Sequence, residues 1–102
     1  MSTDRELLDL AAKAAGIEGV NFDRARRDWS WNPLDDDGNA LRLAVKLDIV
    51  FRCINGVAFA WKDGICDMQE PYSDDRCAAV RRAIVRAAAE IGKAMLKARE
   101  KQ

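Results

Sequence analysis

The last part of this 102-residue chain carries one nearly unbroken helical pattern, whose length restricts how the remainder can fold. Between Asp74 and Arg99 only Gly92 interrupts residues that favour a helix. Ser73 offers an N-cap, and Asp74 and Asp75 suit the positive end of the helix dipole. At about 1.5 Å per residue such a helix is roughly 35 to 40 Å long, longer than a small sheet. We therefore expect its last turns to project or to meet a partner. One apolar stripe runs along it, formed by Cys77, Val80, Ile84, Ala87, Ala88, Ile91, Met95 and Ala98.

Gly92 lies inside this predicted helix, where a glycine costs about 1 kcal/mol relative to alanine. A packing reason is expected for it, because Ala88 and Gly92 have a spacing that permits close approach of two backbones. Gly92 marks either a crossing with another helix or the sheet, or a place where two copies meet. It is therefore a candidate partner-surface residue.

A two-residue turn, Asn55-Gly56, divides a run of β-branched and aromatic residues at positions 48–61. A type I′ turn needs positive φ at both central residues, and Asn-Gly meets this requirement well. The pattern predicts a central antiparallel hairpin. A second turn at residues 62–64 leads to a short edge strand at 65–68, and Pro71 closes the sheet region.

The N-terminal segment begins with a capping box, in which Thr3 and Glu6 satisfy each other's backbone amides. It predicts a helix over residues 4–15 that stops at Gly16. Short strands are predicted at residues 17–22 and 29–31. The charged segment that joins them equally suits a helical turn.

A second helix is predicted after the break at Asn32-Pro33. Apolar residues dominate positions 40–47, and the only clearly polar stripe of the predicted helix consists of Arg42 and Lys46. Because the polar face is so narrow, we expect this helix to be buried on most sides and central to the core.

Three consecutive aspartates, residues 35–37, precede this second helix. An EF-hand loop with its glycine at Gly38 would place Pro33 and Ala44 where carboxylates are required, so that interpretation fails. We predict instead that Asp35 caps the helix and that the next two aspartates occupy its first turn.

These elements predict a single α+β domain over residues 1–102. About three helices and a mostly antiparallel sheet of three to five strands form an α/β/α layered sandwich. Two blocks, WNPLDDDGNALRLAVKL at 31–47 and RRAIVRAAAEIGKAM at 81–95, resemble the phage ABA sandwich domain of tailed-phage and prophage proteins. The resemblance implies helix, sheet and helix layers. It implies no catalytic residue, because the family has no established activity.

Charge is unevenly distributed although the net charge is zero. Residues 76–102 hold eight basic and two acidic side chains, whereas residues 1–75 hold nine basic and fifteen acidic ones. Such polarity indicates either two halves that attract each other on folding or a basic binding face. Nucleic-acid binding is the alternative function, and its candidate contacts are Arg82, Arg86, Lys93 and Lys97 with Arg24, Arg26 and Arg27.

Three tryptophans, Trp29, Trp31 and Trp61, suit a core face, a protein interface or a platform for stacked bases. Trp29 and Trp31 join Gly92 as candidate partner-surface residues. The favoured function is a phage or prophage accessory protein that acts as a non-enzymatic interaction module. Its partner is an unidentified protein or a second copy.

Catalytic chemistry has little support, because the chain lacks histidine and any glycine-rich phosphate loop. Cys53, Cys66 and Cys77 lack a zinc-site spacing and are expected to be free thiols. We expect no cofactor, no metal and no enzymatic activity. No apolar run reaches the length of a membrane span, and the N-terminus is unlike a secretory signal. A cytoplasmic location in a bacterial host is therefore expected, without membrane contact.

Overall fold

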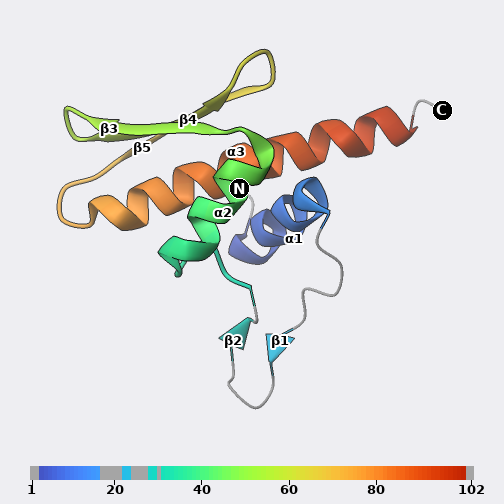
Figure 1. The fold of residues 1–102 in the computed structure, drawn as a ribbon, viewed down its shortest axis with the longest axis horizontal. Coiled ribbons are helices and arrows are strands. Elements are labelled where there is room, and N and C mark those ends of the chain that lie inside the picture. The colour runs from blue at the N-terminus through green and yellow to red at the C-terminus, as the bar shows by residue number, and fades with distance from the viewer. Residues whose placement is uncertain (1–2, 17–21, 24–27, 30, 101–102) are drawn as a thin grey trace.

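The computed structural model describes residues 3–16, 22–23, 28–29 and 31–100. A 25-residue helix, α3 (Arg76–Glu100), forms the middle layer of the protein. A three-stranded antiparallel sheet lies against one side of α3 (Figure 1). Its strands follow the order β3 (Val50–Ile54), β4 (Val57–Lys62) and β5 (Cys66–Pro71). The predicted hairpin therefore forms the sheet together with one further strand.

Two shorter helices, α1 (Asp4–Ala15) and α2 (Asp37–Leu47), pack against α3 away from the sheet. The α+β class, with three helices and an antiparallel sheet in the described residues, is confirmed. The layers run sheet, α3, then α1 with α2. All three helices thus lie on one face of the sheet, whereas the resemblance implied helices on both.

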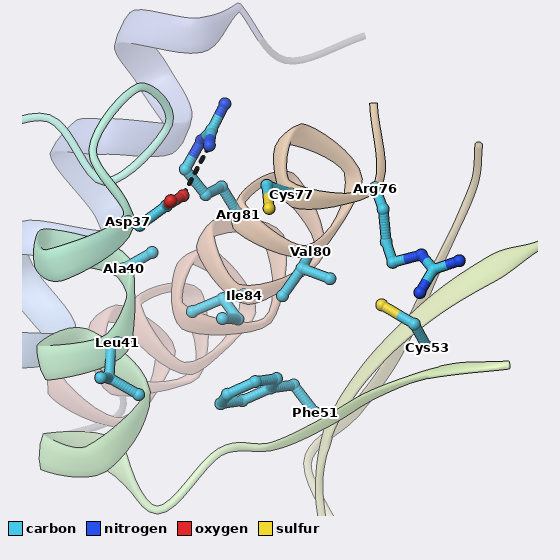
Figure 2. Close-up of a pocket in the computed structure, with 10 residues that line it drawn as sticks. All are labelled: Asp37, Ala40, Leu41, Phe51, Cys53, Arg76, Cys77, Val80, Arg81 and Ile84. Carbon is cyan, nitrogen blue, oxygen red and sulfur yellow. Dashed lines mark hydrogen bonds and ion pairs between the residues drawn. The ribbon is translucent and has the colours of Figure 1, made fainter. Parts of the chain in front are cut away.

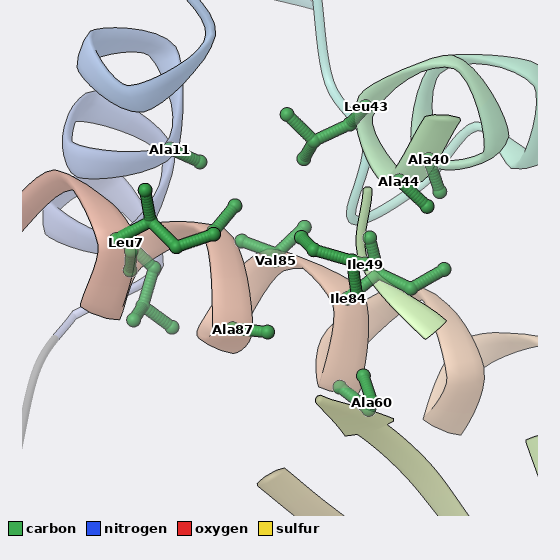
Figure 3. Close-up of a cluster of buried hydrophobic side chains, with 14 of the residues drawn as sticks. Leu7, Ala11, Ala40, Leu43, Ala44, Ile49, Ala60, Ile84, Val85 and Ala87 are labelled. Carbon is green, nitrogen blue, oxygen red and sulfur yellow. The ribbon is translucent and has the colours of Figure 1, made fainter. Parts of the chain in front are cut away.

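The core lies around the middle of α3, which is covered by both neighbouring layers (Figure 3). Leu7 and Ala11 of α1, Leu43 of α2 and Ala60 of β4 contribute to it from the two sides. Small side chains let the backbones of these layers approach α3 closely. The α3 residues that are no more than 1 % exposed are Ala83, Ile84, Val85, Ala87, Ala88 and Ala89.

The exposure of α2 corrects the prediction that this helix is buried on most sides. Leu41 is 52 % exposed and Val45 is 68 % exposed, although both belong to its apolar surface. Only the face with Ala40, Leu43 and Ala44 is buried, because α2 has α3 and α1 beside it and nothing described on its other side. The central helix of the core is α3.

The residues at the two ends of α1 predicted this helix correctly. The Thr3 hydroxyl accepts a hydrogen bond from the Glu6 amide at 3.2 Å. Gly16 ends the helix with a left-handed φ of 69°. The predicted bounds of this helix are confirmed.

The N-caps of the other two helices differ from those predicted. Asp36, and not Asp35, caps α2, and its Oδ2 atom accepts a hydrogen bond from the Asn39 amide at 2.7 Å. Asp75, and not Ser73, accepts a hydrogen bond from the first turn of α3. In both segments several residues in a row are good caps, so residue preference alone does not select one of them.

The central hairpin is confirmed, with positive φ at Asn55 (51°) and Gly56 (76°). β3 begins only at Val50, because Asp48 ends α2 in a left-handed conformation with φ 56°. β5 extends to Pro71, beyond the predicted edge strand.

A separate pair of two-residue strands, β1 (Phe22–Asp23) and β2 (Asp28–Trp29), stands outside the main sheet. They are antiparallel, with Phe22 opposite Trp29. The remaining residues of the two predicted N-terminal strands that lie at 17–21 and 30 are outside the described residues. Within the described part of the chain, no helix has both the length and the apolarity needed to cross a bilayer.

Candidate interaction surfaces

β3 divides its side chains between two surfaces, because alternate residues of a strand face opposite sides of a sheet. Phe51 and Cys53 stand opposite Ala60 and Ala58 of β4, which are fully buried beneath α3. These two residues therefore face the helices. Val50, Arg52 and Ile54 face the other side.

That other side is the open face of the sheet, which no described helix covers. Val50 is 49 % and Ile54 is 40 % exposed. A shallow hollow of about 320 Å³ lies on this face and includes the side chains of Phe59 and Trp61. The register assigns to the open face Val50, Arg52 and Ile54 of β3, Val57, Phe59 and Trp61 of β4, and Asp67, Gln69 and Pro71 of β5.

A second surface, the α2–β3 groove, opens on the helix side of the sheet. Figure 2 shows Leu41 of α2 and Phe51 of β3 pointing into the space next to Ile84 of α3. The groove has a volume of about 320 Å³, within the range of ligand-binding clefts. Its lining residues are Asp37, Ala40, Leu41, Phe51, Cys53, Arg76, Cys77, Val80, Arg81 and Ile84.

An ion pair between α2 and α3 closes one end of the groove. Arg81 Nη1 lies 2.6 Å from Asp37 Oδ1, and Arg81 Nε donates a hydrogen bond to the Leu34 carbonyl at 2.7 Å. The hydrogen bond that Arg81 donates to the Asp37 carboxylate raises the pKa of the Arg81 guanidinium above its ordinary value. Residues 44 positions apart meet here, so local sequence patterns had no signal for the pair.

Carboxylates from the acidic part of the chain already pair with two of the arginines proposed as nucleic-acid contacts. Arg86 Nη1 lies 2.6 Å from Glu70 Oε1, and Arg82 Nη1 lies 3.0 Å from Asp4 Oδ1. Arg82 Nε is also 3.7 Å from Glu70. The interpretation that the two halves attract each other has direct contacts to support it.

The remaining candidate contacts are dispersed. Lys93 pairs with Glu90 at 3.2 Å, and Lys97 is exposed on a later turn of α3. The residues Arg24, Arg26 and Arg27 lie outside the described part of the chain. Nucleic-acid binding through this face stays a prediction.

The candidate partner-surface residues have different environments. Trp31 is half-buried against the core, and the side chain of Trp29 lies outside the described part of the structure. Gly92 is buried, and a Cβ atom there would stand 2.2 Å from the Leu10 carbonyl oxygen of α1. Gly92 is therefore a crossing point between two helices of one chain, which corrects its assignment to a partner surface.

All three thiols are free. Cys53 and Cys77 line the groove, whereas Cys66 Sγ points to the Ala87 carbonyl at 3.6 Å. Burial raises the pKa of the Cys66 thiol above its ordinary value. Among the described residues, no three cysteine or carboxylate side chains gather closely enough to hold a metal ion.

Comparisons with protein-family models, curated proteins and solved structures find no match to this chain. Its function must therefore be inferred from these two surfaces.

Proposed function

We propose that the protein is a non-enzymatic interaction module that forms a homodimer through the open face of its sheet. The observation that carries the proposal is that no described helix covers this face, although apolar residues dominate it. Apolar surface removed from water contributes about 25 cal/mol per Å². Contiguous exposed apolar patches commonly mark interaction sites.

A second copy suits this face because the positive and negative charges on the face of one copy can pair with those on the same face of the other. Arg52 on β3 and Asp67 on β5 have opposite signs and lie on opposite edges of the open face. Two sheets packed face to face about a two-fold axis that runs along the strands place β3 of each copy over β5 of the other, which brings Arg52 of each copy towards the partner's Asp67. The apolar side chains between them then form the centre of the interface.

The size of the face predicts a weak dimer. Three strands spaced about 4.8 Å apart, each five to six residues long, cover roughly 15 Å by 20 Å. This area is smaller than the roughly 800 Å² of accessible surface that stable complexes bury on each partner. We therefore expect a dissociation constant in the micromolar range.

Sedimentation equilibrium over about 5 to 500 µM tests the dimer. The mass of the wild type should rise from monomer towards dimer across this range. Ile54→Glu should hold the mass at monomer, because a carboxylate would be buried in the interface. Ile65→Glu is the matched control, since Ile65 is 47 % exposed in the turn between β4 and β5.

A monomeric mass for the wild type throughout this range would refute the proposed dimer. A dimer that Ile54→Glu leaves intact would show that association uses another surface. Circular dichroism of both variants confirms that the substitutions at these exposed positions leave the fold unchanged.

We further propose that the module belongs to a phage or prophage and acts in the cytoplasm of the bacterial host. The resemblance of residues 31–47 and 81–95 to the phage ABA sandwich domain supports this assignment. Free thiols are typical of a reducing compartment. The genes beside its own provide the test, because phage genes of one stage cluster together. Neighbours of bacterial housekeeping function on both sides would contradict the assignment.

A further inference from the structure

The register of the sheet arranges the side chains of the open face in three rows that run across the strands. The middle row holds Arg52 of β3, Phe59 of β4 and Gln69 of β5, which stand opposite one another in this order. Each row has a β4 residue at its centre, because β4 is the middle strand. The two outer rows consist of Val50, Trp61 and Asp67, and of Ile54, Val57 and Pro71.

Only two residues of the open face are charged, and they lie in different rows. Arg52 belongs to the middle row on one outer strand, whereas Asp67 belongs to an outer row on the other outer strand. Both residues are exposed, and neither forms an ion pair within the described part of the chain. Both charges are therefore available to a partner.

Two arrangements cover the whole open face with the same face of a second copy. Each has a two-fold axis in the plane between the two sheets, and each places β4 over the partner's β4. An axis along the strands exchanges the two outer strands and leaves every row over the same row of the partner. An axis across the strands leaves every strand over the same strand and exchanges the two outer rows.

The charges distinguish these two arrangements. With the axis across the strands, Arg52 lies over the partner's Arg52, because both the middle row and β3 then lie over themselves. Like charges opposed in an interface weaken association strongly. Asp67 lies over the partner's Pro71 in this arrangement and gains no cation.

The axis along the strands brings opposite charges together. Arg52 then lies over the partner's Gln69, whose next neighbour on the same face of β5 is Asp67. These two β5 positions are about 7 Å apart along the strand, a distance that a long arginine side chain can span. The two-fold symmetry forms this contact twice in each dimer.

We infer that Arg52 and Asp67 determine the orientation in which two copies pair, with the two-fold axis along the strands. Their role rests on the proposed homodimer and adds its specificity. The side chains of Val57, Phe59 and Trp61 each meet their own counterpart at the centre of the interface. A suitable partner must carry both charges at these positions, which the chain itself does.

Charge reversal tests this role by sedimentation equilibrium over about 5 to 500 µM. Arg52→Glu and Asp67→Lys should each raise the dissociation constant of the dimer at least about tenfold, because like charges then meet twice. An equimolar mixture of the two variants should form dimers again. In such a mixed dimer both carboxylates of one variant meet the two cations of the other.

Two matched controls make the same charge changes away from the sheet. Lys46→Glu lies on the exposed side of α2, and Asp9→Lys lies on the exposed side of α1. Each control should dimerise as the wild type does, and their mixture should associate no more tightly than either alone. Circular dichroism of all four variants checks that these exposed substitutions leave the fold unchanged.

Isotope-filtered NOEs in a mixture of ¹³C-labelled and unlabelled wild type measure the orientation directly. They should connect Val57 of one copy to the partner's Val57. With the axis across the strands, Val57 would lie over the partner's Trp61 instead. Contacts between copies from Val57 to Trp61 would therefore overturn the assigned orientation.

The outcomes separate this role from the homodimer itself. A wild type that dimerises while Arg52→Glu associates more tightly would overturn the role of the two charges and leave the homodimer intact, because relief of an Arg52–Arg52 contact belongs to the other axis. A mixture of Arg52→Glu and Asp67→Lys that stays monomeric, beside a dimeric wild type, would do the same. A monomeric wild type would refute both the homodimer and its orientation.

Discussion

Gly92 lacks a side chain because the backbone of α1 occupies the position that a side chain would take. A Cβ atom at Gly92 would meet the Leu10 carbonyl oxygen at 2.2 Å, and a backbone carbonyl cannot rotate away as a flexible side chain does. The sequence indicated that this glycine needed a packing reason. Only the folded chain shows that the reason is the crossing of α1 and α3.

Gly92→Ala should lower the free energy of unfolding by about 1 to 3 kcal/mol, because the cost of overpacking exceeds the gain in helix propensity. Urea denaturation measures this change. Gly38→Ala is the matched control, since a Cβ atom there meets only the ends of flexible side chains, the nearest at 3.2 Å. Equal stability changes for the two variants would contradict the role assigned to the helix crossing.

Cys66 should react more slowly with iodoacetamide than the exposed Cys77. The thiolate is the reactive form, and burial raises the pKa of Cys66, so less thiolate is present at any given pH. The rate at Cys66 should continue to rise at pH values above its ordinary pKa of 9.0. Peptide mapping by mass spectrometry after short pulses measures both rates.

Because burial favours the neutral thiol, the stabilising contribution of Cys66 is present below pH 9.0. It is lost as the pH rises through the higher pKa that Cys66 has in the folded protein.

At the scale of elements, two helices end in the same left-handed conformation with different residues. Gly16 ends α1 with φ 69°, and Asp48 ends α2 with φ 56°. Glycine adopts this conformation without steric cost, whereas residues with a Cβ atom are strained in it. Because Asp48 takes this left-handed conformation, it is not extended, and the strand predicted from residue 48 begins only at Val50.

Asp48→Gly should therefore raise the free energy of unfolding by about 0.5 to 1 kcal/mol. Gly16→Ala should lower it by about 1 kcal/mol, since no neighbouring atom lies within 4 Å and the backbone conformation alone opposes the change. Thermal and urea unfolding of the pair measure both effects. Changes of the same sign in the two variants would be inconsistent with this explanation.

At the scale of the whole molecule, opposite charges join the two parts of the chain. Four of the five ion pairs among the described residues link an α3 arginine to a carboxylate that precedes α3. Glu70 forms ion pairs with two of these arginines, and its side chain is only 18 % exposed. The zero net charge therefore conceals an electrostatic attraction between layers.

Raising the salt concentration from about 0.02 to 0.3 M should lower the free energy of unfolding by roughly 1 kcal/mol, because salt screens these pairs. Glu70→Gln should reduce that salt dependence, since Arg82 and Arg86 then lack their shared carboxylate. Lys93→Gln is the control, because its pair with Glu90 lies within α3. Equal salt dependence in wild type and Glu70→Gln would exclude the attraction between layers as its source.

Interactions between residues close in sequence determined much of this structure. The capping box at Thr3, the stop at Gly16 and the Asn55-Gly56 turn were all predictable, because each depends on a few neighbouring residues. The α+β class followed from the order of these elements.

The arrangement of the elements was decided only by tertiary packing. The sequence pattern of α2 is apolar almost all round, yet Leu41 and Val45 remain exposed because the other elements cover only one side of that helix. The contact of Asp37 with Arg81 and the crossing at Gly92 join residues distant in sequence. A periodic pattern states which side chains prefer burial, but the neighbours that bury them are fixed only when the layers pack. For this reason the open face of the sheet and the α2–β3 groove emerged only from the fold.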